Sequence, residues 1–328
     1  MAPTDQNYAP PTRRLWRSAT ALVCALALFT LSGAACPQMV KQYKLPVAAA
    51  QARALTLDEL ALRINEHSAQ VQSLSSTSVT LSGPQFPSLK ANLALERPQR
   101  FRLVAEKTGL TGPELDLGSN DELFWFWVKR SEPPAIYFCR HDQFATSSAR
   151  QVFPVEPQWL LEALGLLQIN PAEVTYGPSP VGGSRQRLEL TLSGAAGARR
   201  KVIVFDDSIG AVVEQHMYDE SGALLASALL SEHERDEATG TMLPREIRIQ
   251  WPPTRFEMKI ELADLQVNQL AGDPAQLWAK PEYRGWANVD LADPRAQLPP
   301  PTFRARTPEP TIDTATADRR GLFGFFKR

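Results

Sequence analysis

Cys36 is the residue whose position most clearly points to a specific chemical modification. It follows the small residues 33–35, which in turn follow an apolar run over residues 19–31. Before that run stand the arginines Arg13, Arg14 and Arg17. A positive start, a short apolar run and small residues before a cleavage point are the parts of an export signal. The run of about 13 residues is too short to cross a bilayer, which needs roughly 20. We therefore predict a signal peptide over residues 1–35.

The segment around Cys36 resembles a bacterial lipobox, and this resemblance predicts a lipid modification in addition to export. In that motif the signal peptidase cuts before the cysteine, and the thiol receives a diacylglycerol group. Gly33 occupies the position where lipoboxes usually have leucine, and Leu31 lies two residues earlier. We expect lipidation of Cys36, with secretion without a lipid and an uncleaved anchor as the alternatives.

The remaining cysteines are Cys24, inside the predicted signal, and Cys139. If Cys36 is lipidated, Cys139 is left unpaired; otherwise the two can form a disulfide in an oxidising compartment. Cys139 ends the apolar run 135–139, which favours a small buried hydrophobic residue on a strand. The spacing of the cysteines predicts no metal site.

The four histidines offer little for catalysis. The two local candidates are His141, beside Asp142, and His233, within the segment 231–234. Adjacent residues of a strand point to opposite faces, so neither run forms a site by itself. The sequence also has no Gly-x-Ser-x-Gly, no His-Glu-x-x-His and no phosphate-binding glycine loop. We therefore predict that the protein is not an enzyme and uses no metal and no cofactor.

The charge balance argues against nucleic acid as a partner. The 328 residues include 35 Lys and Arg against 36 Asp and Glu, a net charge of −1, whereas nucleic-acid binders normally show a basic excess. The hydrophobic fraction of 43% supports a folded core. Without the signal and the C-terminal tail, roughly 240 residues remain, enough for one large all-β domain or two small ones.

Two segments have helical periodicity. Thr56 and Glu59 form a capping-box pattern at the start of residues 57–71, whose apolar positions recur at about 3.6 residues. Residues 154–169 carry a broad apolar surface, with Pro157 near the start. We predict a helix in each segment.

Elsewhere the apolar period is two, which predicts strands. Residues 89–95 and 101–105 alternate apolar and polar side chains, and Arg97-Pro98 fits a tight connection between them. Residues 123–128 are apolar on both faces, so a helix, a loop or a ligand must cover each side. A meander with closely spaced turns follows over 187–262. We predict a mainly β (α+β) fold of about 11–13 antiparallel strands.

The apolar side chains exceed what an ordinary two-faced sheet needs. Such a surplus predicts an apolar ligand cavity, and the alternative is a conventional core between sheet and helix. The residues that we expect to line a cavity are Leu93, Phe101, Leu103 and Trp125 from strands, with Leu160 and Leu164 from the second helix.

Three short segments resemble motifs of the LolA/LolB-like superfamily of outer-membrane lipoprotein carriers and receptors. Residues 97–103 look like its Pro-x-x-Phe-Arg strand start, and residues 115–121 and 124–127 look like its next hairpin. The likeness covers residues 55–265. It implies an incomplete antiparallel β-barrel with helices as a lid over a hydrophobic cavity for lipoprotein acyl chains. Apolar burial of about 0.8 kcal/mol per CH₂ can hold such a chain without a cofactor.

These expectations divide the chain into a signal over 1–35, a tether over 36–54, a half-barrel domain over 55–291 and a disordered Pro-rich tail over 292–328 with a basic and aromatic end. We expect a lipid-anchored protein of the cell envelope, facing the periplasm, on the outer membrane rather than the inner. Its expected partners are a lipid or lipoprotein acyl chains, the membrane through Cys36, and a periplasmic carrier protein. The alternative is a structural or signalling lipoprotein with a filled core and a tail that docks a partner.

Overall fold

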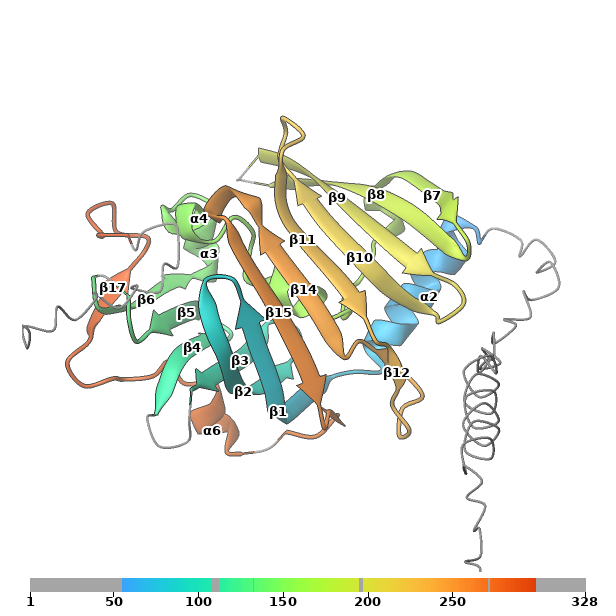
Figure 1. The fold of residues 1–328 in the computed structure, drawn as a ribbon. Helices are drawn as coiled ribbons and strands as arrows, with labels where there is room; N and C mark the ends of the chain where they lie inside the picture. The colour runs from blue at the N-terminus through green and yellow to red at the C-terminus, as the bar shows by residue number, and fades with distance from the viewer. Residues whose placement is uncertain (1–54, 108–111, 132, 195–196, 271, 299–328) are drawn as a thin grey trace, which may run out of the picture. The chain divides into compact units, whose positions relative to one another are not determined.

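The computed structural model describes residues 55–107, 112–131, 133–194, 197–270 and 272–298. The predicted signal, the tether with Cys36, and the tail beyond residue 298 lie outside these residues. The described chain forms one large open sheet with short helices packed against it (Figure 1). None of the described helices combines the length and the hydropathy that a membrane crossing requires.

The first half of the sheet is an antiparallel meander. Its strands are β1 (Ser73–Gly83), β2 (Phe86–Glu96), β3 (Arg100–Glu106), β4 (Pro113–Ser119), β5 (Leu123–Val128) and β6 (Ala135–Arg140). β2 and β3 contain the two alternating runs, and Arg97-Pro98 lies in the turn between them, as predicted. Leu93 pairs with Leu103 across these strands, so both side chains lie on the same face of the sheet.

The second half is a longer antiparallel meander. Its strands are β7 (Val174–Gly182), β8 (Arg185–Gly194), β9 (Gly197–Asp206), β10 (Ala211–Tyr218), β11 (Leu224–Ser231), β14 (Glu246–Trp251) and β15 (Phe256–Ala263). A separate small hairpin of β12 (Glu234–Arg235) and β13 (Met242–Leu243) connects β11 to β14. A 3₁₀ turn, η2 (Pro252–Thr254), connects β14 to β15.

The two meanders join where β1 pairs with β15, for example Val79 with Leu262. β16 (Gln266–Val267) also pairs with β1, and β17 (Ala287–Asp290) adds a parallel strand at β6. The resulting 15-stranded sheet runs from β17 to β7, and among the described residues these two ends do not pair. The predicted mainly β, incomplete barrel is thus confirmed. Its strand number exceeds the expected range only through the short strands β16 and β17.

The first helix, α2 (Leu57–Ala69), begins at the predicted capping box. The Thr56 hydroxyl accepts a hydrogen bond from the backbone N–H of Glu59 (3.3 Å), and the Glu59 carboxylate accepts one from the N–H of Thr56 (2.8 Å). Leu60, Ala61 and Ile64 are buried in a cluster with apolar side chains of β8, β9 and β10. α2 therefore covers one part of the sheet, as its amphipathic pattern requires.

Of the second predicted helix, over residues 154–169, only α5 (Gln158–Glu162) forms in the structure. Two further short helices, α3 (His141–Phe144) and α4 (Ala149–Val152), precede it, and the 3₁₀ turn η1 (Pro171–Glu173) follows. Pro154 forces Phe153 into an extended conformation, and Gly165, with φ of +86°, prevents the helix from continuing. We call residues 141–167 the covering segment.

The covering segment packs on the same side of the sheet as α2, which we call the inner face. Its buried apolar residues join those of β1–β6, β11, β14 and β15 in one cluster, including Phe144, Val152, Phe153, Val155, Trp159, Leu161 and Leu164. The other side of the sheet is the outer face.

β5 is covered on both faces, as its sequence predicts. Phe124 and Phe126 point to the inner face and meet the ring of Phe153. On the outer face, Trp127 stacks on Tyr283, with ring centroids 4.1 Å apart. Tyr283 belongs to residues 273–290, a C-terminal segment that contains α6 (Pro274–Leu277) and β17. A covering segment and a loop, both from this chain, therefore cover the strand.

Candidate functional site

The inner face brings together five of the six residues predicted to line a cavity. Leu93, Phe101 and Leu103 come from β2 and β3 and are at most 6% exposed. Leu160 and Leu164 come from the covering segment and pack against the same cluster. These residues lie far apart in the sequence, and the sheet and the covering segment bring them to one side of the domain.

Trp125 lies on the opposite face. Its indole Nε1 donates a hydrogen bond to the Asp116 carboxylate (3.1 Å), and the Arg102 guanidinium lies 5.8 Å from the ring centroid. The ring covers Gly118 so closely that a Cβ atom there would come within 2.2 Å of it. Trp125 thus packs against the outer-face side chains and does not contact the inner-face cluster.

Aromatic side chains of the protein itself fill much of the inner face. The Phe153 ring lies edge-on to three others, with centroid distances of 5.4 Å to Phe124, 5.0 Å to Phe126 and 5.6 Å to Trp251. Phe153 stands between α4 and α5, so the covering segment inserts it into the sheet's apolar cluster. The described structure is closed on this side.

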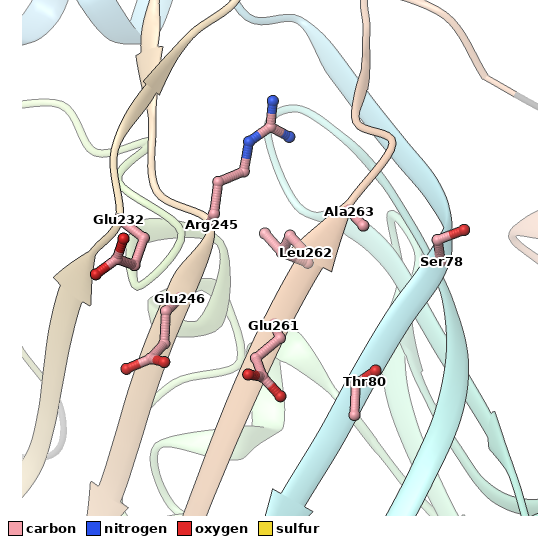
Figure 2. A pocket seen from close by; sticks show the side chains of 8 residues that line it. All are labelled: Ser78, Thr80, Glu232, Arg245, Glu246, Glu261, Leu262 and Ala263. Carbon is pink, nitrogen blue, oxygen red and sulfur yellow. The ribbon is translucent and has the colours of Figure 1, made fainter.

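Two shallow pockets are found on the outer face, and both are largely polar. One, of about 390 Å³, lies over β1, β14 and β15, and Figure 2 shows its lining residues Ser78, Thr80, Glu232, Arg245, Glu246, Glu261, Leu262 and Ala263. The other, of about 360 Å³, lies over β7–β10 beside His216. Neither has the apolar lining that a hydrocarbon chain requires.

A polar stripe divides the apolar inner face. It consists of Arg199 and Lys201 on β9 and Gln215 on β10, which alternate with outward-facing neighbours. The Lys201 ammonium pairs with the Glu162 carboxylate, and the Gln215 amide donates to the backbone carbonyl of Glu162. The stripe is therefore the place where the sheet and the covering segment make polar contacts.

Arg199 is the least satisfied member of this stripe. It is 7% exposed, and its Nε and Nη2 atoms have no hydrogen-bond partner among the described residues. Its nearest carboxylate, that of Glu156, lies 3.9 Å away and is itself mostly exposed. Burial lowers the pKa of the Arg199 guanidinium from its usual value, although an arginine remains charged in proteins.

Reasoning from the sequence did not identify this stripe. Arg199, Arg200 and Lys201 are consecutive basic residues, so the sequence does not show which of them point inward. The continuation of the strand could have indicated it. Ile203 and Phe205 are apolar and lie on the inner face, and alternate residues of β9 share a face, so Arg199 and Lys201 point the same way.

The outer face carries a serine, a histidine and a glutamate in contact. His216 Nδ1 lies 3.0 Å from Ser227 Oγ, and His216 Nε2 lies 3.3 Å from a Glu214 carboxylate oxygen. A nucleophilic serine also needs donors for the developing oxyanion. β11 is paired on both sides, with β10 and β14, so its backbone N–H groups are engaged in the sheet. This cluster is a set of hydrogen bonds on the outer face, where Glu214 and His216 line the pocket over β7–β10.

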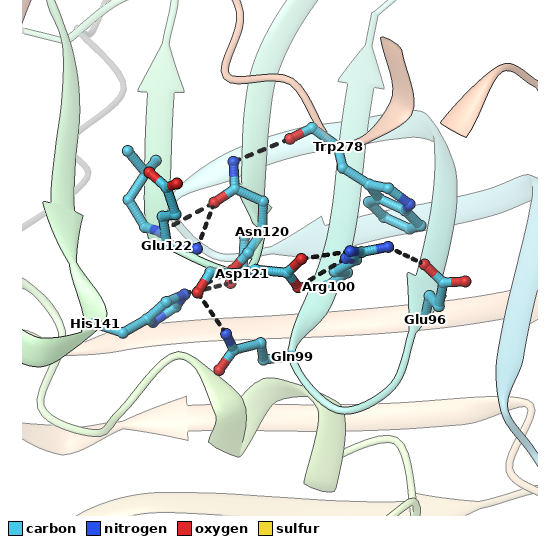
Figure 3. Close-up of polar contacts among 10 residues, drawn as sticks. Glu96, Gln99, Arg100, Asn120, Asp121, Glu122, His141 and Trp278 are labelled. Atoms are coloured by element: carbon cyan, nitrogen blue, oxygen red, sulfur yellow. Dashed lines mark hydrogen bonds and ion pairs between the residues drawn. The ribbon is translucent and has the colours of Figure 1, made fainter. Parts of the chain in front are cut away.

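His141 is held in a second hydrogen-bond cluster, at the β4–β5 turn (Figure 3). Its Nε2 atom lies 2.9 Å from the Asn120 carbonyl oxygen and 3.2 Å from Ser119 Oγ. A carbonyl only accepts, so Nε2 carries a proton and cannot act as a base toward Ser119. Asn120 also caps the turn by accepting from the N–H groups of Glu122 and Leu123.

Comparison with known proteins adds a likeness of fold. No family model and no curated protein matches the sequence. Among solved structures, the chain resembles a LolA superfamily protein from Nitrosomonas europaea at 13% identity, covering 69% of this chain and 99% of that one, with a TM-score of 0.44. A putative outer membrane lipoprotein-sorting protein domain from Vibrio parahaemolyticus matches at 10% identity, with 66% and 96% coverage and a TM-score of 0.45.

A DUF1329 family protein from Desulfovibrio piger matches at 15% identity, with 67% and 97% coverage and a TM-score of 0.44. At these identities and scores, none of the matches assigns a function to this chain. The LolA/LolB-like resemblance implies an incomplete antiparallel β-barrel with helices over its apolar face, and the described residues form an open sheet with α2 and the covering segment on the inner face.

Proposed function

We propose that this chain is an exported protein of the cell envelope, anchored through a lipid on Cys36, which binds a lipid or the acyl chains of a lipoprotein on the inner face. The covering segment would act as the lid over the bound chain. The domain would face the periplasm from the outer membrane and exchange its cargo with a periplasmic carrier protein. Binding would rest on apolar burial, without catalysis.

The construction of the covering segment supports this proposal most directly. α3, α4 and α5 have four, four and five residues, and none has a side-chain cap. Helices this short are not stable by themselves. Their position therefore depends mainly on apolar contacts with the sheet, and such contacts are non-directional. A hydrocarbon chain can replace them without leaving many broken hydrogen bonds.

The energies of the two sets of contacts are comparable. A palmitoyl chain gains about 0.8 kcal/mol per methylene on burial, or roughly 12 kcal/mol in all. A buried Val, Leu or Phe side chain gains about 1.5–3 kcal/mol. The burial free energy of one acyl chain thus equals that of several apolar side chains of the covering segment, but not that of all of them. We expect the segment to shift on binding and not to unfold.

The closed inner face supports a second candidate, a structural or signalling lipoprotein. In that case the Phe153 cluster is a permanent core, and the chain beyond the half-barrel docks a partner. Ala292 and Leu298 pack against the core, so a test by deletion should begin after residue 298. Loss of a partner on deletion of residues 299–328, in a chain that binds no lipid, would favour this candidate.

Binding of a fluorescent fatty acid to the purified chain tests the first candidate, together with native mass spectrometry after mild purification. Leu164→Asn places an amide at the inner face, and Leu229→Asn makes the same change on the outer face, where Leu229 is 42% exposed. We expect Leu164→Asn to weaken binding at least about tenfold, the effect of about 1.4 kcal/mol, and Leu229→Asn to leave it unchanged.

A wild-type chain that carries no lipid and does not bind the probe would contradict the first candidate. Equal losses in both variants would also contradict it, because they would indicate that the probe adheres to the surface. Circular dichroism of both variants would show whether the fold is retained.

A further inference from the structure

We infer that Arg199 binds the anionic group of the lipid, a carboxylate or a phosphate, when the covering segment moves aside. This inference rests on the proposed function and adds the chemical class of the ligand. It concerns the polar stripe, whose cations are attached to the sheet while their acidic partners are attached to the covering segment.

The cations of the polar stripe and their carboxylate partners lie on different segments of the chain. Arg199 and Lys201 are both on β9, whereas Glu156 and Glu162, the carboxylates that face them, are both on the covering segment. If the covering segment shifts, both carboxylates leave together, and Arg199 and Lys201 remain on the apolar inner face without anionic partners. Uncompensated buried charge is costly, so the open form requires anions from elsewhere.

Arg199 is suited to receive such an anion even in the closed form. Its Nε and Nη2 atoms are buried and have no hydrogen-bond partner among the described residues, and the Glu156 carboxylate is only within 3.9 Å. The charge of Arg150 acts on Arg199 as well, and it lowers the pKa of this guanidinium further. Two nearby guanidinium groups attract an anion. A carboxylate or a phosphate can accept two parallel hydrogen bonds from one of them.

The location of the stripe connects this anion site to an alkyl chain. Leu192, opposite Arg199 on β8, packs against both apolar clusters of the inner face, one under α2 and one under the covering segment. A head group at Arg199 therefore leaves its hydrocarbon chain next to apolar surface. The ligand class that fits is a single-chain or double-chain lipid with an anionic head, not a free anion.

Isothermal titration of the purified full chain with four probes tests the inference. Laurate and dodecyl phosphate carry an anionic head, dodecanol has the same chain without charge, and inorganic phosphate has the charge without the chain. We expect the two anionic lipids to bind about tenfold more tightly than dodecanol, and inorganic phosphate to bind far more weakly than either.

Three substitutions assign the effect to a residue. Arg199→Gln should lower the affinity for laurate and dodecyl phosphate about tenfold and leave that for dodecanol unchanged, while Arg199→Lys should retain part of the preference. Arg200→Gln is the matched control. Arg200 is the next residue on β9, but it points to the outer face, where it pairs with Glu189 (3.0 Å).

Each other outcome is informative. Equal wild-type affinity for laurate and dodecanol, or an Arg199→Gln variant that keeps the preference, would overturn this inference and leave the proposed function standing. If inorganic phosphate binds as tightly as laurate, the claim that the anion bound by Arg199 belongs to a lipid would be wrong. Failure of all three alkyl probes to bind the wild type would overturn the proposed function and this inference with it.

Discussion

Arg102 shows how one residue of a short motif can organise a distant part of the chain. Its guanidinium pairs with Asp116 (2.7 Å), which is fully buried, and also donates to backbone carbonyls of residues 276, 277 and 279. The Tyr283 hydroxyl donates to the same carboxylate (2.8 Å). The arginine of the Pro-x-x-Phe-Arg pattern thus fastens the C-terminal segment to the outer face, while Phe101 points into the inner-face core.

Neutralising Asp116 should therefore be costly. We expect Asp116→Asn to lower the free energy of unfolding by about 3 kcal/mol, because Arg102 is left without its charged partner in a buried site. Asp121→Asn removes one of the two carboxylate partners of Arg100 at the surface, leaving Glu96, and should cost less than about 1 kcal/mol. Urea unfolding of both variants measures the difference. Similar losses would show that the Asp116 network adds little beyond a surface ion pair.

At the scale of the element, the mobility of the covering segment has a native reporter. Cys139 is fully buried on β6, under the segment, with Sγ 3.6 Å from Ser147 Oγ. Burial raises the pKa of its thiol, which keeps the reactive thiolate scarce at neutral pH. Alkylation of Cys139 therefore requires the segment to open.

We predict slow alkylation of Cys139 in the purified chain and a rate that rises at least about tenfold when Phe153→Ala weakens the apolar contacts, since such a change costs about 3–5 kcal/mol in a core. The labelled peptide is identified by mass spectrometry, which separates Cys139 from the other cysteines. Phe256→Ala, at the start of β15, is a control for general destabilisation. A larger rate increase in the control than in Phe153→Ala would contradict opening at the covering segment.

The elements differ in how far the sequence predicts them. The alternating residues of β2 and β3 were sufficient to predict these strands, because one face of each is buried. The capping box was sufficient to predict where α2 begins. Residues 154–169 were predicted as one helix because their apolar residues are dense, whereas in the structure only α5 is helical and Gly165 prevents it from continuing. The facing of Trp125 was not predictable, since β5 is apolar on both sides. The polar stripe depends on a contact between segments far apart in the chain.

At the scale of the whole molecule, two half-buried histidines make stability depend on pH. The His67 ring lies 2.7 Å from the Met242 carbonyl oxygen, and burial lowers the pKa of both His67 and His233 below the usual 6.5. Between the lowered pKa values and 6.5, the unfolded chain binds more protons than the folded one. Stability is therefore complete above pH 6.5 and falls as the pH drops below it.

We expect the midpoint of thermal unfolding to fall between pH 7 and pH 5, and His67→Gln to reduce this dependence while keeping a donor toward Met242. Burial alone would raise the pKa of Asp206, but hydrogen bonds from Ser184 and Ser208 lower it on balance, so Asp206 does not titrate in this range. A midpoint that stays constant to pH 5 in the wild type would contradict the role of the two half-buried histidines.

The proposed lipid anchor also belongs to the scale of the whole molecule, and it predicts modification of Cys36. Metabolic labelling of producing cells with a palmitate analogue should label the wild-type chain and the Cys24→Ala variant but not Cys36→Ala. The Cys36→Ala variant should also leave the membrane fraction. Labelling that persists in Cys36→Ala would contradict lipidation at this cysteine.

The junction of the two meanders has a consequence for biogenesis. Val79 on β1 pairs with Leu262 on β15, 183 positions later. The first meander can assemble as soon as its strands have been synthesised, yet β1 keeps an open edge until nearly the entire domain has followed. An open strand edge invites pairing with other chains. A newly made copy should therefore depend on chaperones during the interval between synthesis of β6 and synthesis of β15.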